Sequence, residues 1–257
     1  MLVLHAVNCF AQVPVSDGSG IVFAFWHSNL AGKIVIACLM LGSIFSWSVM
    51  VSKIYMIRRA RRETRRFLKR FRTARKPLAI YQSGEAYPGS PAYAVYLAGC
   101  RELTFHLLGT TEIDDTFTQR LAEADRISSV AMNSVRSAME REVGEQALRL
   151  EDRMTVLATA VSGAPFLGLL GTVWGVMDTF SAIAASNNAS LTTMAPGVSG
   201  ALITTVTGLL VAIPAMFGYN FLVVTLRGMT VELDNFAAEL ASSFDHRYLD
   251  TSVAAGR

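Results

Sequence analysis

The stretch that decides the fold is Met154–Met177, which reads MTVLATAVSGAPFLGLLGTVWGVM. Its 24 residues carry no charged side chain and are bounded by Arg153 and Asp178. A helix of roughly 20 apolar residues is long enough to cross about 30 Å of hydrocarbon. The stretch therefore predicts a membrane-spanning helix.

Two further charge-free stretches lie on either side of it. Ile34–Ser52 is bounded by two lysines and has the length of one span. Thr179–Leu226 is too long for one span and is interrupted by the polar run SNNAS at 186–190 and by APG at 195–197. A helix is expected to begin near Pro196, because proline suits the first helical turn. The count is three spans.

The composition of the 257-residue chain agrees with a membrane protein. Hydrophobic residues make up 52%, charged residues only 17%, and the mean hydropathy is +0.38. Soluble domains carry about 25% charged residues, and disordered chains are polar and highly charged. Three cysteines are too few to stabilise a chain of this length by disulfide bonds, which excludes a secreted disulfide-rich protein. Because no strand-like alternation is present, the predicted class is an all-α membrane protein.

A basic run sets the orientation. Residues 58–76 contain eleven Lys or Arg and one acid, Glu63. Positive charge beside a span stays in the cytoplasm, so the N-terminus is expected outside and the C-terminus inside. The run also predicts an amphipathic helix, since apolar residues recur at helical spacing: Ile57, Ala60, Phe67, Leu68 and Phe71. This helix is either a plain anchor or a binding face for anionic lipids.

The expected organisation has seven segments. They are an external N-terminal segment at 1–30, transmembrane helix 1 at 31–54, a cytoplasmic helical domain at 55–153, transmembrane helix 2 at 154–184, a short external loop at 185–195, transmembrane helix 3 at 196–226, and a cytoplasmic C-terminal helix and tail at 227–257. A helical pattern begins near Asp114 and meets no Gly-Pro break before the second span. It predicts one continuous helix into the membrane.

Patterns typical of enzymes are missing from the sequence. No Ser-His-Asp set, phosphate loop or dinucleotide fingerprint is present. The four histidines share no ligand spacing: His5, His27, His106 and His246. We therefore expect no enzymatic activity, no metal and no cofactor. Nucleic acid is not an expected partner, because the basic run adjoins a membrane span.

Small residues form a stripe on each of the two later helices. On the second helix the stripe is Gly168, Thr172, Gly175 and Thr179, and on the third it is Gly197, Ala201, Thr205, Gly208 and Ala212. Small residues let helix backbones approach closely in lipid. The residues expected to serve helix packing are Gly168, Gly171, Gly175, Gly197, Ala201 and Gly208.

Two threonines and two prolines stand out within these helices. Thr172 and Thr205 lie mid-span, one on each stripe. A hydroxyl there can bond water or a carboxyl group inside a bundle, or only a carbonyl of its own helix, and the pattern favours neither. Pro165 and Pro214 each remove a backbone donor from the helix and are candidate kinks.

These strings resemble the TolQ/ExbB/MotA proton-channel family. The matching strings are GLLGTVWG at 168–175, APG at 195–197, ALITT at 201–205 and AIPA at 212–215, with SWSV at 46–49 and Lys53 also similar. The GTVWG string followed by Met177 and Phe180 looks more like TolQ than ExbB. Members of the MotA type usually have four spans, whereas this chain has three.

The resemblance implies a bacterial inner-membrane motor. The family forms a pentamer around two copies of a single-span partner, TolR or ExbD, whose membrane aspartate carries protons, and the complex does mechanical work on the envelope with a TolA- or TonB-like protein. By motif, Thr172 and Thr205 would line the pore. One position departs: the family commonly has Glu where this chain has Gly200, so a proton step ascribed to that glutamate is in doubt here.

The residues themselves agree with a need for a partner. Titratable groups inside a membrane mark ion pathways, yet this chain has none in mid-span, because Asp178 ends the second helix. Three other functions stay open: an ExbB-like subunit that energises TonB-dependent outer-membrane import, a stand-alone transporter, and a passive scaffold. A transporter would show broken helices at a midplane site, and the sequence shows little of that.

Overall fold

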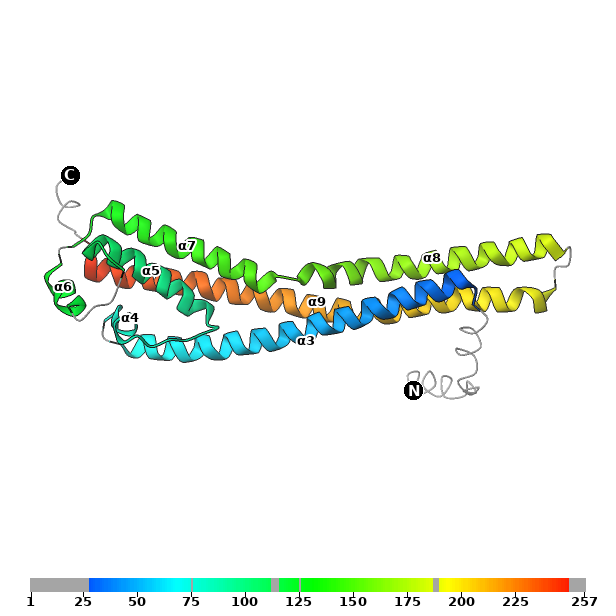
Figure 1. Ribbon diagram of the computed structural model, residues 1–257, viewed down its shortest axis with the longest axis horizontal. Coiled ribbons are helices and arrows are strands. Elements are labelled where there is room, and N and C mark those ends of the chain that lie inside the picture. The colour runs from blue at the N-terminus through cyan, green and yellow to red at the C-terminus, as the bar shows by residue number, and fades with distance from the viewer. Residues whose placement is uncertain (1–27, 75, 112–115, 125, 187–189, 250–257) are drawn as a thin grey trace, which may run out of the picture. The chain divides into compact units, whose positions relative to one another are not determined.

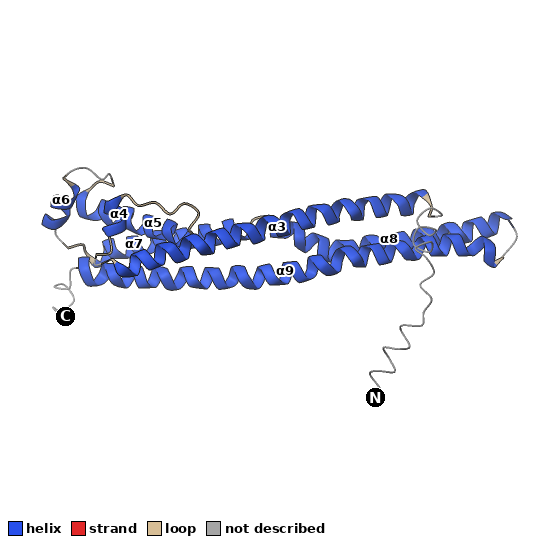
Figure 2. Cartoon of the chain, turned by 90° about the horizontal axis from the view of Figure 1, so that it is seen from below, coloured by secondary structure: helices blue, strands red, loops and turns tan. Residues whose placement is uncertain are grey.

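The computed structural model describes residues 28–74, 76–111, 116–124, 126–186 and 190–249. Among them, seven helices and no strand are present (Figures 1 and 2). The helices are α3 (Leu30–Thr73), α4 (Ala79–Ser83), α5 (Pro91–Leu108), α6 (Phe117–Glu123), α7 (Ser129–Glu151), α8 (Met154–Ser186) and α9 (Leu191–Tyr248). The all-α prediction is confirmed.

Three of these helices are long and apolar enough to cross a membrane. They are α3, α8 over Met154–Ala185, and α9 over Met194–Tyr248. The prediction of three spans is therefore confirmed. Residues 1–27 of the expected external segment and 187–189 of the expected loop lie outside the described residues, and the orientation of the spans stays a prediction.

The chain divides into two compact units. The first, here called the membrane unit, comprises the described residues of 28–50 and 155–219, and the second, here called the polar unit, comprises the described residues of 51–154 and 220–249. Both α3 and α9 contribute residues to each unit. In the membrane unit the three helices meet around a small apolar core made of Leu39, Ala164, Val211 and Ala212.

Aromatic side chains form the core of the polar unit. Phe67 of α3 is fully buried, and its ring centroid lies 5.4 to 6.0 Å from those of Phe71, Tyr87, Tyr93, Tyr96 and Phe236. Edge-to-face pairs at such spacings stabilise a core beyond simple burial. Phe67 and Phe71 therefore face α5 and α9. Of the other apolar positions predicted for this face, Ile57 and Ala60 are buried and Leu68 is half-buried, while the arginines of α3 are exposed except for the half-buried Arg61.

Polar groups buried with this core are paired. Tyr96 donates its hydroxyl to the Pro77 carbonyl at 2.8 Å and accepts from the Tyr81 backbone at 3.0 Å. Burial raises the pKa of Tyr96 far above its usual range. The neighbouring Cys100 is also fully buried, and burial raises the pKa of its thiol in the same way. This thiol is therefore unreactive while the unit stays folded.

The prediction of one continuous helix from Asp114 into the second span is wrong. The described residues there form α6, α7 and α8, and α7 ends at Glu151, with Arg153 at φ +60° before α8 begins. The last carbonyls of a helix lack internal partners, and one of them is bonded from elsewhere. Lys53, only 5% exposed, donates its ammonium to the Leu150 carbonyl at 3.0 Å. Apolar spacing within one segment cannot reveal such a tertiary bond.

Two other boundaries differ from the expected segments. α9 begins at Leu191, five residues before Pro196, and runs unbroken to Tyr248. Pro196 therefore lies inside the helix, beyond its first turn. The second difference is that the expected third span and C-terminal helix form a single element, because no helix-breaking sequence separates Leu226 from the apolar positions Met229, Leu233 and Phe236, which are buried in the polar unit.

Candidate ion pathway at the contact of α8 and α9

Glycines bring the backbones of α8 and α9 close together within the membrane unit. A Cβ added at Gly208 would lie 2.6 Å from the Ala164 carbonyl oxygen. One at Gly175 would lie 2.8 Å from the Ala201 Cβ, and one at Gly168 would lie 2.9 Å from the Thr204 carbonyl oxygen. Real Cβ atoms do not approach other atoms this closely, so only glycine fits at these three positions.

This contact differs from the predicted stripes at one position on each helix. On α8 the buried line contains Gly171 rather than Thr172, and on α9 it contains Thr204 rather than Thr205. Gly171 and Thr204 meet directly, since a Cβ at Gly171 would lie 2.6 Å from that of Thr204. Thr172 and Thr205 are each the next residue along and are half-buried. Both therefore lie at one level, beside the contact rather than inside it.

Thr204 is the residue that the sequence reasoning missed. Its side chain is fully buried, and its hydroxyl lies 2.6 Å from the Ala201 carbonyl and 3.1 Å from the Gly168 carbonyl across the contact. The sequence does contain a pattern that predicts its position, because Gly197, Ala201, Thr204 and Gly208 step by four, three and four. This spacing fits the helical period of 3.6 residues at least as well as the spacing of the stripe through Thr205.

The two predicted hydroxyls differ in their bonding. Thr205 donates across the contact to the Gly168 carbonyl at 3.1 Å. Thr172 donates to the Leu169 carbonyl of its own helix at 2.7 Å. Each hydroxyl has thus placed its single proton on a carbonyl, and each oxygen keeps lone pairs that can accept a hydrogen bond. The pair can receive a donor without any rearrangement.

The end of the contact near Asp178 explains why this chain has glycine at position 200, where the family commonly has glutamate. A Cβ at Gly200 would lie 2.8 Å from the Ser28 Cα, so the backbone before α3 fills the space that a side chain would need. Asn29, next to Ser28, donates its side-chain amide to the Asp178 carboxylate. A glutamate at position 200 has no room in this arrangement. Gly197 packs against Thr179 nearby, whose hydroxyl bonds the Gly175 carbonyl at 2.8 Å.

The two prolines lie inside continuous helices. Pro165 is within α8 and Pro214 is within α9, and both are half-buried. Their role as kinks stays a prediction. Gly171, Gly175, Gly197, Ala201 and Gly208 all face the contact between α8 and α9 or its end, together with Gly168.

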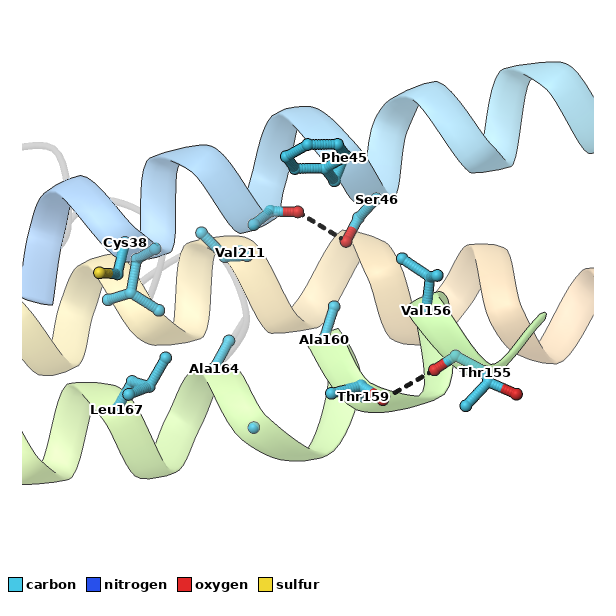
Figure 3. Close-up of a pocket in the computed structure, with 13 residues that line it drawn as sticks. Cys38, Phe45, Ser46, Thr155, Val156, Thr159, Ala160, Ala164, Leu167 and Val211 are labelled. Atoms are coloured by element: carbon cyan, nitrogen blue, oxygen red, sulfur yellow. Dashed lines mark hydrogen bonds between the residues drawn. The ribbon is translucent and has the colours of Figure 1, made fainter. Parts of the chain in front are cut away.

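A cavity of about 450 Å³ lies elsewhere in the membrane unit, between α3, α8 and α9 (Figure 3). Its lining is almost entirely apolar, and the hydroxyls of Ser46 and Thr159 are bonded to their own helices. Ser46 donates to the Gly42 carbonyl at 2.9 Å, and Thr159 donates to the Thr155 carbonyl at 2.8 Å. The lining therefore offers no proton carrier. Within the described ranges, no group of three or more His, Cys, Asp or Glu residues is placed to hold a metal ion.

These features define a multi-span all-α membrane protein in which two helices meet through glycines, with hydroxyl groups beside the contact. The chain belongs to the MotA/TolQ/ExbB proton channel family, whose sequence profile matches residues 109–235. That range includes α7, α8 and most of α9, and therefore the whole contact described above.

Known members of the family are similar over much of the chain. The Tol-Pal system protein TolQ of Haemophilus influenzae is 29% identical over 229 residues, which cover 85% of this chain and 90% of that protein. TolQ of Pseudomonas aeruginosa is 29% identical over 76% of this chain and 79% of its own length. The biopolymer transport protein ExbB of Xanthomonas campestris is 41% identical over 107 residues, 42% of each chain.

Proposed function

We propose that this chain is the channel subunit of a TolQ–TolR type motor in a bacterial inner membrane, which converts proton-motive force into mechanical work on the cell envelope. The observation that carries the proposal is the pair Thr172 and Thr205, half-buried at one level beside a closed helix contact. Likeness to two TolQ proteins over most of their length supports the Tol type.

The proton carrier in this proposal is an aspartate of a single-span, TolR-like partner, because the mid-span residues of this chain do not titrate. A neutral carboxylic acid donates its proton to a threonine oxygen, which accepts while its own hydrogen stays on the Leu169 or Gly168 carbonyl. A carboxylate only accepts. When the proton leaves, a hydroxyl must therefore rotate away from its carbonyl and donate to the anion.

This rotation gives the site two states. A buried carboxylate is costly unless it is hydrogen-bonded, and charge-assisted bonds are stronger than neutral ones. Thr205 can leave the Gly168 carbonyl without orphaning it, because the Thr204 hydroxyl lies 3.1 Å from the same oxygen and can turn to it from the Ala201 carbonyl, 2.6 Å away. In this proposal Thr204 serves the pathway by donating to that carbonyl when Thr205 turns away.

The assembly is proposed to be a homo-oligomer, a pentamer by family resemblance, with a TolA-like protein as the envelope partner. Large apolar side chains near the threonines support this, since Val173 is 61% exposed and Leu202 is 59% exposed in a single chain. Such surfaces need lipid or another subunit to cover them. The N-terminus is external and the segment 55–153 cytoplasmic in this proposal, where anionic lipids can meet the basic face of α3.

One alternative has an observation in its favour. The 41% identity to an ExbB protein over 107 residues keeps an ExbB-like subunit, energising TonB-dependent import, as the second candidate. A stand-alone transporter is less favoured, because α8 and α9 are continuous where such proteins have broken helices. If the chain were a passive scaffold, its activity would not depend on the hydroxyls of Thr172 and Thr205.

The test is proton flux in vesicles that hold the chain together with a single-span partner bearing a membrane aspartate. We expect the two proteins to co-purify and the vesicle interior to change pH when a membrane potential is imposed. The control is the partner with its aspartate changed to asparagine, which should abolish the flux while co-purification persists. Flux that does not need the aspartate would contradict the proposal, and so would failure of the chain to retain either a TolR- or an ExbD-type partner.

A further inference from the structure

The cavity of about 450 Å³ between α3, α8 and α9 lies entirely within the membrane unit (Figure 3). All of its lining residues belong to the three charge-free stretches that are predicted to cross the bilayer. Several of them are exposed at the surface of the chain: Cys38, Phe45, Val156 and Leu167. The cavity therefore opens sideways, at the depth of the membrane.

Two glycines provide much of the space in this cavity. Gly42 of α3 and Gly163 of α8 both line it, and a Cβ added at either would meet nothing within 4 Å. The glycines between α8 and α9 differ, since a Cβ at Gly171 would lie 2.6 Å from that of Thr204. Gly42 and Gly163 therefore do not serve a close helix contact. They leave a slot between α3 and α8.

Water is a poor occupant of this slot. Ser46 and Thr159 each donate their hydroxyl to a carbonyl of their own helix, at 2.9 and 2.8 Å. A water molecule in a cavity needs two to four polar partners, and apolar cavities stay dry. An unfilled apolar cavity costs free energy that grows with its volume. The lining thus favours an apolar occupant.

The dimensions of the slot fit a single hydrocarbon chain. On α8 the lining runs over twelve residues from Thr155 to Leu167, which is roughly 18 Å at about 1.5 Å per residue. One leaflet contributes roughly 15 Å of hydrocarbon, half of the bilayer's core. A helix of that length, with a diameter of about 10 Å, would occupy roughly 1,200 Å³, well over twice the 450 Å³ present. A helix from another chain is therefore too bulky.

We propose that the cavity holds one acyl chain of a membrane phospholipid. The acyl chain lies along α8 against Gly163, contacts α3 at Gly42 and ends toward Leu167. The headgroup lies at the Thr155 end, because α8 begins there directly after the charged residues 151–153. The proposal goes beyond the proposed function, since it needs only that the three helices cross a membrane.

The acyl chain extends the apolar core of the membrane unit. That core consists of Leu39, Ala164, Val211 and Ala212, and the first three of these residues also line the cavity. The lipid therefore packs against the residues at which α3, α8 and α9 meet. A ligand that binds only the folded state raises its stability by mass action, so the retained lipid should stabilise this unit.

The first test counts the phospholipid that the purified protein retains in mild detergent, by native mass spectrometry. Gly163→Leu fills the slot from α8 and should retain at least fivefold less phospholipid than the parent. Gly42→Leu fills it from α3 and should act in the same way. The matched control is Ala182→Leu, an exposed position of α8 outside the cavity, which should retain as much as the parent.

Thermal unfolding of delipidated protein gives the second measurement. Added phospholipid should raise the melting temperature of the parent and of Ala182→Leu, but not that of Gly163→Leu, whose own side chain occupies the slot. This comparison also shows whether Gly163→Leu folds, because a folded variant still melts cooperatively. Equal retention and an equal shift of melting temperature in all variants would mean that the lipid is bound only at the general surface, and would overturn the proposal.

Photocross-linking in intact membranes identifies the occupant. The photoreactive residue p-benzoylphenylalanine in place of Phe45, which lines the cavity, should yield an adduct with the mass of a phospholipid. Gly163→Leu should lower that yield several-fold. The control places the same residue at Phe217, exposed on α9 outside the lining, where Gly163→Leu should change nothing. A main product at Phe45 with a second copy of the chain, with a single-span partner or with a free fatty acid would overturn the proposal.

Discussion

At the scale of single residues, two hydroxyls lie within hydrogen-bond distance of one backbone carbonyl. The hydroxyl oxygens of Thr204 and Thr205 both lie 3.1 Å from the Gly168 carbonyl oxygen, from adjacent positions on α9, and that of Thr204 also lies 2.6 Å from the Ala201 carbonyl oxygen. Thr204 is fully buried and Thr205 half-buried, so the first can only pack while the second can also reach a partner. Under the proposed function, Thr204 is therefore a positioning residue and Thr205 is the contact for the partner's carboxyl group.

The close approach at Gly171 leads to a prediction about stability. Gly171→Ala would place a methyl group 2.6 Å from the Thr204 Cβ and force α8 and α9 apart. Overpacking of this kind costs about 1–3 kcal/mol, so the purified protein should unfold at a lower temperature. The matched control is Gly163→Ala on the same helix, where an added Cβ meets nothing within 4 Å. Equal melting temperatures for the two variants would refute the tight contact.

At the scale of elements, the break between α7 and α8 is stabilised from outside both helices. Lys53→Met removes the donor that bonds the Leu150 carbonyl, and an orphaned buried acceptor costs about 1–3 kcal/mol. We expect trypsin to cut faster at the exposed Arg153 in this variant. Lys53→Arg, which keeps a donor, should be cut at a rate nearer the parent's. Unchanged cleavage in Lys53→Met would show that the bond does not hold the break.

The elements also show how far the sequence could lead. The spans followed from charge-free length, and the buried face of α3 followed from the spacing of Ile57, Ala60, Phe67 and Phe71. The break at Asp152 and Arg153 could not be read from the sequence, because no Gly or Pro marks it. In the candidate site, the small-residue stripes were visible except at one position on each helix, since steps of three and four both fit a helix.

The close packing around Gly200 could not be predicted from the sequence for a different reason. The departure from the family's usual glutamate was visible, but its cause is a tertiary contact with Ser28, far away in the chain. The bonding of Thr172 and Thr205 was equally hidden, because a mid-helix hydroxyl can bond its own helix or a neighbour. Of the two, Thr172 does the first and Thr205 the second.

At the scale of the whole molecule, the eleven basic residues after the first span predict that the segment following it is cytoplasmic. A reporter fused near Gly84 should read as cytoplasmic and one at Asn188 as external. The measurement is paired reporter activity, with one enzyme active only in the cytoplasm and the other active only outside it. The opposite result at either site would remove the three-span arrangement on which the partner's position depends.

The central claim is that Thr172 and Thr205 receive the carboxyl group that carries protons, and partner-dependent proton flux tests it most directly. The measurement compares Thr172→Val, Thr205→Val and their combination with Thr207→Val, a half-buried control on α9 whose hydroxyl bonds only its own helix, at the Ile203 carbonyl. The account predicts assembled complexes with flux lowered at least tenfold in the double variant and unchanged in Thr207→Val. Full flux in the double variant, with normal assembly, would contradict it.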